Sequence, residues 1–113
     1  MNTQQFKQVE QIEKPEAELI FSSGNSDQIC FALLSSAFYI NDWKWVQDKC
    51  LSFLSSPDID VVRIAIICLG HIARINRKIE KEKVLTALRS EALPNETKGT
   101  VEDAIDDITM FAK

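Results

Sequence analysis

The sequence is poor in the residues on which catalytic and metal sites depend. Its 113 residues include one histidine, three cysteines without a Cys-x-x-Cys pair, and three isolated glycines. A general base needs an orienting partner and a nucleophile close by, and His71 has only Cys68 near it, on an apolar helical face. Isolated glycines do not form a phosphate-binding loop. We therefore expect no metal, no cofactor and no enzymatic activity.

Long apolar runs and a targeting segment are also missing. No stretch reaches the length of about 18 apolar residues that a membrane-spanning helix requires, and the first residues show no basic and apolar pattern of a signal peptide. Cys30, Cys50 and Cys68 lie in apolar helical patterns, and an odd number of buried cysteines is typical of reduced thiols in a cytosolic core. The sequence thus predicts a cytoplasmic protein with no membrane attachment.

Basic charge is scarce, with 13 Lys and Arg against 17 Asp and Glu and a net charge of -4. A protein that binds nucleic acid directly usually carries a basic face, so this balance argues against direct nucleic-acid binding. The charge is uneven: residues 41–78 carry +2, whereas residues 1–40 and 79–113 carry -3 each.

The densest apolar segment, residues 56–77, is expected to be the central helix of the fold. Asp58 or Asp60 can cap its start, and the basic residues at its end suit a helix C-terminus. One helical face gathers Val62, Ala65, Ile66, Leu69, Ile72 and Ala73. A helix that is apolar on nearly every side must be covered on nearly every side, which places it in the middle of the molecule.

Capping and periodic signals predict further helices and no strand. The expected helices cover 1–14, 15–21, about 26–39, 43–54, 80–93 and 98–111. Gly24 is suited to the left-handed residue that ends the second of these.

The helices repeat at a regular interval. A shift of 33 residues places Ala65 on Ala32, and a shift of 39 places it on Ala104, with apolar residues aligned around each alanine. The fold class predicted is therefore all-α: a single domain, 1–113, built as a short α-solenoid of about three helical hairpins plus an N-terminal helix. The hairpins are roughly 15–39, 42–76 and 80–111.

The middle repeat, residues 55–75, resembles a HEAT repeat. Pro57, then Asp58 or Asp60, then the pair Val62-Arg63 follow the HEAT pattern, and the resemblance implies a structural role for that arginine, bonded to a turn aspartate. The other repeats depart from the pattern, because Cys30 and Glu102 stand where Arg63 stands.

A narrower resemblance covers residues 27–113. The phrases NDWKWVQDKCLSFL, CLGHIARI and VEDAIDDITMFAK resemble stand-alone bacterial HEAT-like proteins encoded beside polymorphic toxins, as in contact-dependent growth inhibition (CDI). The resemblance implies an immunity protein, not an enzyme, that binds and blocks a cognate toxin domain. The toxin expected is a nuclease, with a tRNA-cleaving enzyme as one example. It also implies a monomer or a heterodimer with the toxin.

Two charged stripes are candidates for the toxin contact. Glu102, Asp103, Asp106 and Asp107 are predicted to share the outward face of the last helix, at a cost from like charges at i,i+4. A binding face and a solubilising outer face explain this ridge equally well. Arg63, Arg74 and Arg77 form the second stripe, which is either a solvated ridge or a surface for acidic groups of a partner.

Three further residues have two interpretations each. Trp45 is either pinned by the preceding helix through Phe38 or Tyr39, or an exposed aromatic contact for a partner, and Tyr39 is the second candidate contact. His71 is either a packing residue at a helix end or an interface residue.

Two functions of different class follow from these patterns. The first is toxin neutralisation by protein–protein interaction, with Glu102, Asp103, Asp106, Asp107, Trp45, Tyr39 and Arg74 as the partner-binding residues. The alternative is a small HEAT-like module that binds nucleic acid or processes DNA bases. The acidic charge and the missing catalytic residues favour the first.

Overall fold

The computed structural model describes residues 11–112, and within that range the backbone is helical with no strand. This confirms the all-α prediction. The helices are α1 Lys14–Phe21, α2 Ser26–Tyr39, α3 Trp43–Phe53, α4 Ile59–Asn76, α5 Lys81–Leu88 and α6 Lys98–Phe111, with a short 3-10 turn, η2 Asn95–Thr97, before α6.

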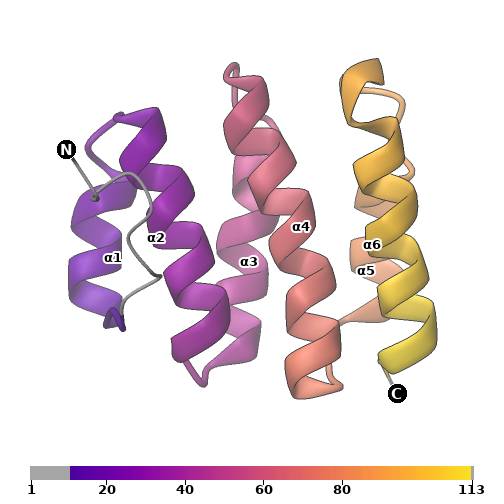
Figure 1. The fold of residues 1–113 in the computed structure, drawn as a ribbon, viewed down its shortest axis with the longest axis horizontal. Helices are drawn as coiled ribbons and strands as arrows, with labels where there is room; N and C mark the ends of the chain where they lie inside the picture. The colour runs from indigo at the N-terminus through magenta and orange to yellow at the C-terminus, as the bar shows by residue number, and fades with distance from the viewer. Residues whose placement is uncertain (1–10, 113) are drawn as a thin grey trace, which may run out of the picture.

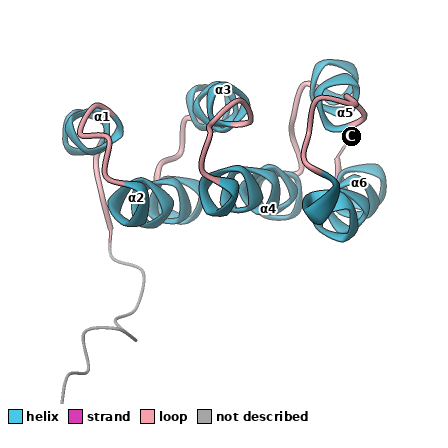
Figure 2. Ribbon diagram, turned by 90° about the horizontal axis from the view of Figure 1, so that it is seen from above, coloured by secondary structure: helices cyan, strands magenta, loops and turns pink. Residues whose placement is uncertain are grey.

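The helices form three antiparallel hairpins that stand side by side in two layers. Figure 2 shows α1, α3 and α5 in one layer and α2, α4 and α6 in the other. Because each hairpin turns back in the same way, α2, α4 and α6 run parallel, and their C-terminal ends lie along one edge of the molecule (Figure 1). The molecule measures 40 × 29 × 26 Å along its principal axes.

Helix α4 lies in the middle, as its composition predicts. It packs against α2 and α6 in its own layer and against α3 in the other. All six residues of the predicted inner face are buried. The Asp58 side chain accepts the backbone N–H of Asp60 at the start, and Arg77 ends the helix in the left-handed region with φ 59°.

Side-chain caps also define the starts of α2 and α3. The Asn25 side chain accepts from the Gln28 N–H and the Asp42 side chain from the Trp45 N–H. Gly24, with φ +78°, makes the left-handed turn between α1 and α2.

Two predicted boundaries differ from the structure. Helix α5 ends at Leu88 and not at Leu93, because the chain turns at Ser90, whose hydroxyl accepts the N–H of Ala92. Residues 1–10 of the predicted 1–14 helix lie outside the described residues, while residues 11–13 are not helical and α1 begins at Lys14.

None of the described helices combines the length and the apolar composition needed to cross a bilayer.

Candidate partner-binding face

A polar groove of about 510 Å³ lies between α4 and α6 on the face formed by α2, α4 and α6. From α6 it is lined by three of the predicted acids, Asp103, Asp106 and Asp107, and from α4 by His71 and Arg74, among others. Asp103 and Asp106 are exposed and Asp107 is half-buried. The structure therefore brings three of the four predicted acids together with Arg74.

Gly70 sets how closely α6 approaches α4 at this groove. A Cβ at this position would lie 3.1 Å from Asp107 Oδ2, 3.4 Å from the Ala104 Cα and 3.6 Å from the Ala104 Cβ. The missing side chain gives the Asp107 carboxylate its place beside the α4 backbone. The recurrent alanine of the sequence, Ala104 in this hairpin, lies on the same contact.

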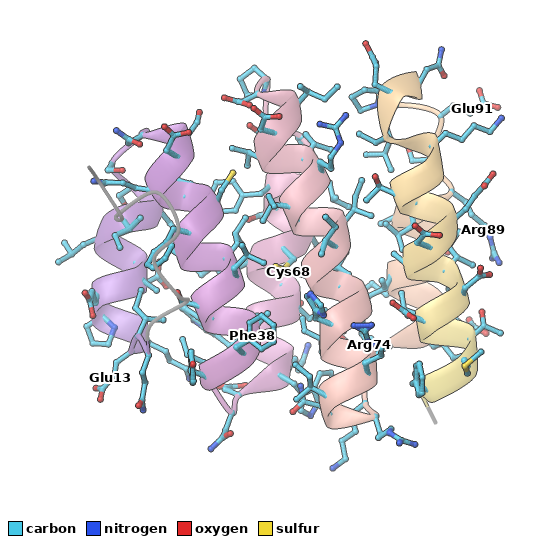
Figure 3. The ribbon with its side chains drawn as sticks, viewed as in Figure 1. Glu13, Phe38, Cys68, Arg74, Arg89 and Glu91 are labelled. Carbon is cyan, nitrogen blue, oxygen red and sulfur yellow. The ribbon has the colours of Figure 1, made fainter. Side chains whose placement is uncertain are left out.

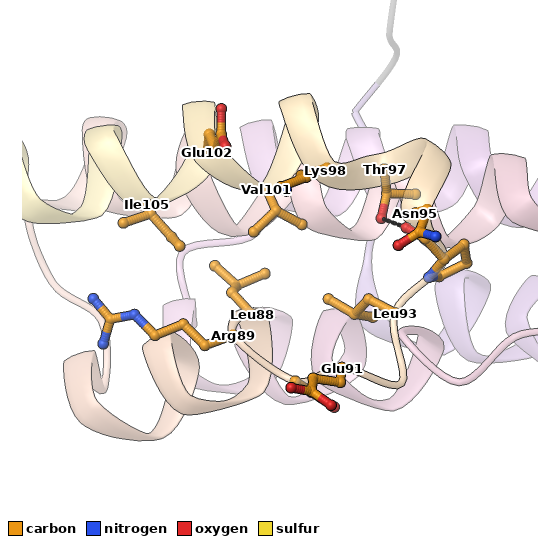
Figure 4. A pocket seen from close by; sticks show the side chains of 12 residues that line it. Leu88, Arg89, Glu91, Leu93, Asn95, Thr97, Lys98, Val101, Glu102 and Ile105 are labelled. Atoms are coloured by element: carbon orange, nitrogen blue, oxygen red, sulfur yellow. Dashed lines mark hydrogen bonds between the residues drawn. The ribbon is translucent and has the colours of Figure 1, made fainter.

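Glu102 opens onto a different groove. This second groove, of about 540 Å³, lies between α6, the end of α5 and the turn that follows it. Figure 4 shows Leu88 and Val101 facing one another across it, with Ile105 beside them and Glu102 at the α6 rim. Glu102 lies one helical turn before Asp106, so the four predicted acids occupy neighbouring positions on α6, with Glu102 also bordering the second groove.

Arg74 is the one predicted arginine that lines the α4–α6 groove among the described residues. Its Nη2 lies 3.5 Å from Nδ1 of His71. Arg63 instead pairs with Asp60 at 3.4 Å, an aspartate of its own repeat, and Arg77 lies over the Phe111 ring, 5.3 Å from its centroid. The predicted arginine stripe is divided among three separate environments.

His71 joins the groove to an aromatic side chain of the neighbouring helix. The imidazole and Phe38 rings are 5.1 Å apart between centroids, which is aromatic contact distance. Burial lowers the pKa of His71, the Arg74 guanidinium lowers it further, and the Asp107 carboxylate opposes both. The net effect is a lowered pKa for this half-buried ring.

Tyr39 follows Phe38 at the end of α2, and both side chains are 45% exposed. The two ring centroids are 6.5 Å apart. Tyr39 therefore lies beside Phe38 at the C-terminal end of α2.

Trp45 lies in the other layer, on α3, where it packs against the small core cluster that includes Ala17 of α1 and Ala32 of the preceding helix α2. Its half-buried ring is 6.4 Å from that of Phe21 at the end of α1. The Lys14 and Lys49 ammonium groups lie 5.4 and 5.3 Å from its ring centroid, within the range of cation–π attraction. Its contacts tie the first hairpin to the second.

The thiols are free and show no sign of activation. Cys50 and Cys68 are buried, as expected, whereas Cys30 is only half-buried. Burial, with nearby aspartates, raises the pKa of Cys30 to about 11, and a hydrogen bond with Cys50 together with burial raises that of Cys68. Within residues 11–112 no group of three or more His, Cys, Asp or Glu is placed to hold a metal ion.

Comparison with solved structures links this fold to a known complex. The chain is similar to a chain in the crystal structure of the CDI complex from Cupriavidus taiwanensis LMG 19424, with 26% sequence identity and a TM-score of 0.79. The alignment covers 93% of each chain. This chain is a relative of a CDI-complex protein. The match confirms the resemblance to CDI proteins carried by the sequence phrases of α3, α4 and α6.

No protein-family model and no curated protein matches the chain. The CDI relationship therefore depends on the three-dimensional match together with the sequence phrases.

Proposed function

We propose that this chain is an immunity protein that binds a cognate toxin domain and neutralises it by protein–protein interaction. The observation that carries the proposal is the match to a chain of a CDI complex over 93% of both chains. The similarity extends over the whole arrangement of hairpins, which is the surface that a partner meets. Burial raises the pKa of the Cys30 and Cys68 thiols, which disfavours the thiolate form that a cysteine nucleophile needs.

The proposal also covers the fold type, the oligomeric state and the cellular compartment of the protein. The three stacked hairpins and the Arg63–Asp60 pair support a single HEAT-like solenoid domain. We place its action in the cytoplasm, as a monomer until it binds the toxin as a heterodimer.

The acidic groove supports the hypothesis that the toxin is a nuclease, for example one that cleaves tRNA. Nucleases bind polyanions and so expose basic residues around their active sites. Asp103, Asp106 and Asp107 supply complementary charge on a packed helix, so little ordering is lost when they meet a basic surface. The same carboxylates repel phosphates, which disfavours the alternative of a nucleic-acid-binding module.

The predicted residues contribute unequally in this arrangement. Asp103, Asp106, Asp107 and Arg74 border one groove, with Tyr39 at the edge of the same face. Glu102 is exposed one turn before Asp106 and extends the same contact, whereas Trp45 contributes only if the partner also reaches the opposite layer.

The test replaces Asp103, Asp106 and Asp107 together with Asn. The fold should be kept, because two of these side chains are exposed and the third borders a groove. The probe is the toxin domain that the proposal expects the gene directly upstream to encode. Its association should slow by about tenfold, with a weaker salt dependence, since complementary charge mainly steers encounter. Stopped-flow association rates at several salt concentrations measure both effects.

A matched control carries the same change of charge elsewhere. Glu16→Gln, Asp27→Asn and Glu82→Gln remove three exposed acids from α1, α2 and α5. This variant should associate within about twofold of the parent. Equal slowing in both triple variants would show that net charge, and not the groove, governs association, and unchanged rates in both would remove the acidic groove from the interface.

A further inference from the structure

The apolar side chains that remain exposed gather at one edge. Five large apolar residues are exposed within the described chain: Leu19, Phe38, Tyr39, Ile75 and Met110. All but Leu19 lie in the last turns of α2, α4 and α6. Since these helices run parallel, their C-terminal ends stand side by side along the lower edge in Figure 1.

Three of these side chains, those of Phe38, Ile75 and Met110, belong to the face that carries the acidic groove, and the Tyr39 ring lies next to that of Phe38. Ile75 follows His71 by four positions on α4, and Met110 follows Asp106 by four on α6, so each continues the stripe that lines the groove. Phe38 reaches the same stripe from α2 through its contact with the His71 ring. In Figure 3, Phe38 and Arg74 stand in front of neighbouring helices on the same side.

We propose that this apolar edge, formed by Phe38, Tyr39, Ile75 and Met110, is the energetic centre of the toxin interface. Its occupant is a toxin surface with an apolar centre flanked by lysine or arginine side chains. The inference rests on the proposed function and adds where most of the binding free energy arises.

The chemistry of the two parts of the face differs. Exposed aromatic and apolar groups that lose water on binding contribute most of the affinity at protein interfaces. Charged groups at a rim mainly steer and orient the partner. The apolar edge therefore holds the complex together, and Asp103, Asp106 and Asp107 guide it into place.

Charge selects a basic partner over a second copy of this chain. In a two-fold symmetric contact the same patch meets itself. Such a contact over this edge would bring the aspartates of two chains together, in a protein whose net charge is already -4. A basic toxin surface meets the same acids with attraction.

The Phe38 ring is preorganised for binding by its contact with His71. It rests against the His71 imidazole, 5.1 Å between ring centroids, while 45% of its surface stays exposed. A ring supported in this way loses little freedom when a partner covers it.

The experiment compares Phe38→Ala with Leu19→Ala. Leu19 is the matched control because it is an exposed apolar residue, at 75%, on α1 and away from this face. The probe is the upstream-encoded toxin domain with an inactivating substitution in its own active site. Phe38→Ala should raise the Kd at least tenfold, mainly through faster dissociation and without a change in salt dependence, whereas Leu19→Ala should stay within twofold.

Met110→Ala separates binding from folding. Its side chain is 73% exposed, so the variant should melt like the parent and still raise the Kd about threefold or more. Sedimentation of the free parent chain should show a monomer at the concentrations of the binding assay.

The outcomes distinguish the two proposals. If the parent does not bind the upstream toxin domain, the proposed function fails and this inference fails with it. If the parent binds and Phe38→Ala and Met110→Ala bind equally well, the toxin-binding function stands and the apolar edge is not its centre. A dimer of the parent that Phe38→Ala dissociates would make a second copy the occupant and overturn the inference.

Discussion

Gln47 shows how a single buried side chain joins two hairpins. It is fully buried on α3, and its Nε2 donates to Glu80 Oε1 at 2.7 Å while its Oε1 accepts the Glu80 backbone N–H at 2.7 Å. Glu80 precedes α5 and has no side-chain cap of its own, so the Gln47 amide supplies the missing acceptor. A buried amide is retained here because its hydrogen bonds are made.

The Glu80 carboxylate makes the free energy of unfolding fall as the pH becomes acidic. Hydrogen bonds from Gln47, and then from Lys44, lower the pKa of Glu80 from 4.5 to about 2. A lowered folded-state pKa means that its contribution is complete above about pH 4.5 and is lost as the pH falls toward 2. Between pH 6 and pH 3, Glu80→Gln should therefore lose less stability than the parent in urea unfolding. Glu82→Gln, an exposed neighbour, serves as control, and parallel losses in Glu80→Gln and the parent would contradict the assignment.

At the scale of elements, α4 is the helix whose burial the fold requires. Ile66 has no exposed surface and lies in the main core cluster with Ala65 and Leu69. Ile66→Asp places an unpaired charge there, at a cost of more than about 4 kcal/mol, a large part of the stability of a small domain.

The expected result is loss of the cooperative thermal transition in circular dichroism. Ile75→Asp is the control, because Ile75 is on the same helix but 47% exposed, and it should fold. A melt of Ile66→Asp like that of the parent would mean that α4 is not the core of the molecule.

At the scale of the whole molecule, stability should fall from the middle hairpin outward. Each hairpin contacts only its neighbours, and α4 packs on α2, α3 and α6. In such a stack the outer units open more easily than the centre. Hydrogen exchange followed by mass spectrometry should find α4 most protected and the eight-residue α5 less protected. Equal protection of both would show that the chain opens only as a whole.

Much of this fold follows from local sequence. Asn25, Asp42 and Asp58 cap helices through contacts two or three residues away, and such contacts are readable from the chain alone. The apolar period likewise identified the buried face of α4. The end of α5 was missed, because Leu93 continues the apolar pattern although the Ser90 turn has already stopped the helix.

The sequence by itself determined the helices, their caps, the central place of α4 and the acids of α6. The tertiary structure alone decided which of these residues meet. Phe38 reaches His71 and Gln47 reaches Glu80 across 33 residues each, and three acids of α6 border one groove with His71 and Arg74 of α4. Periodicity assigns a side chain to a face of its own helix, but the angle and offset between neighbouring helices fix its partner. For that reason the apolar edge beside the acidic groove became visible only in three dimensions.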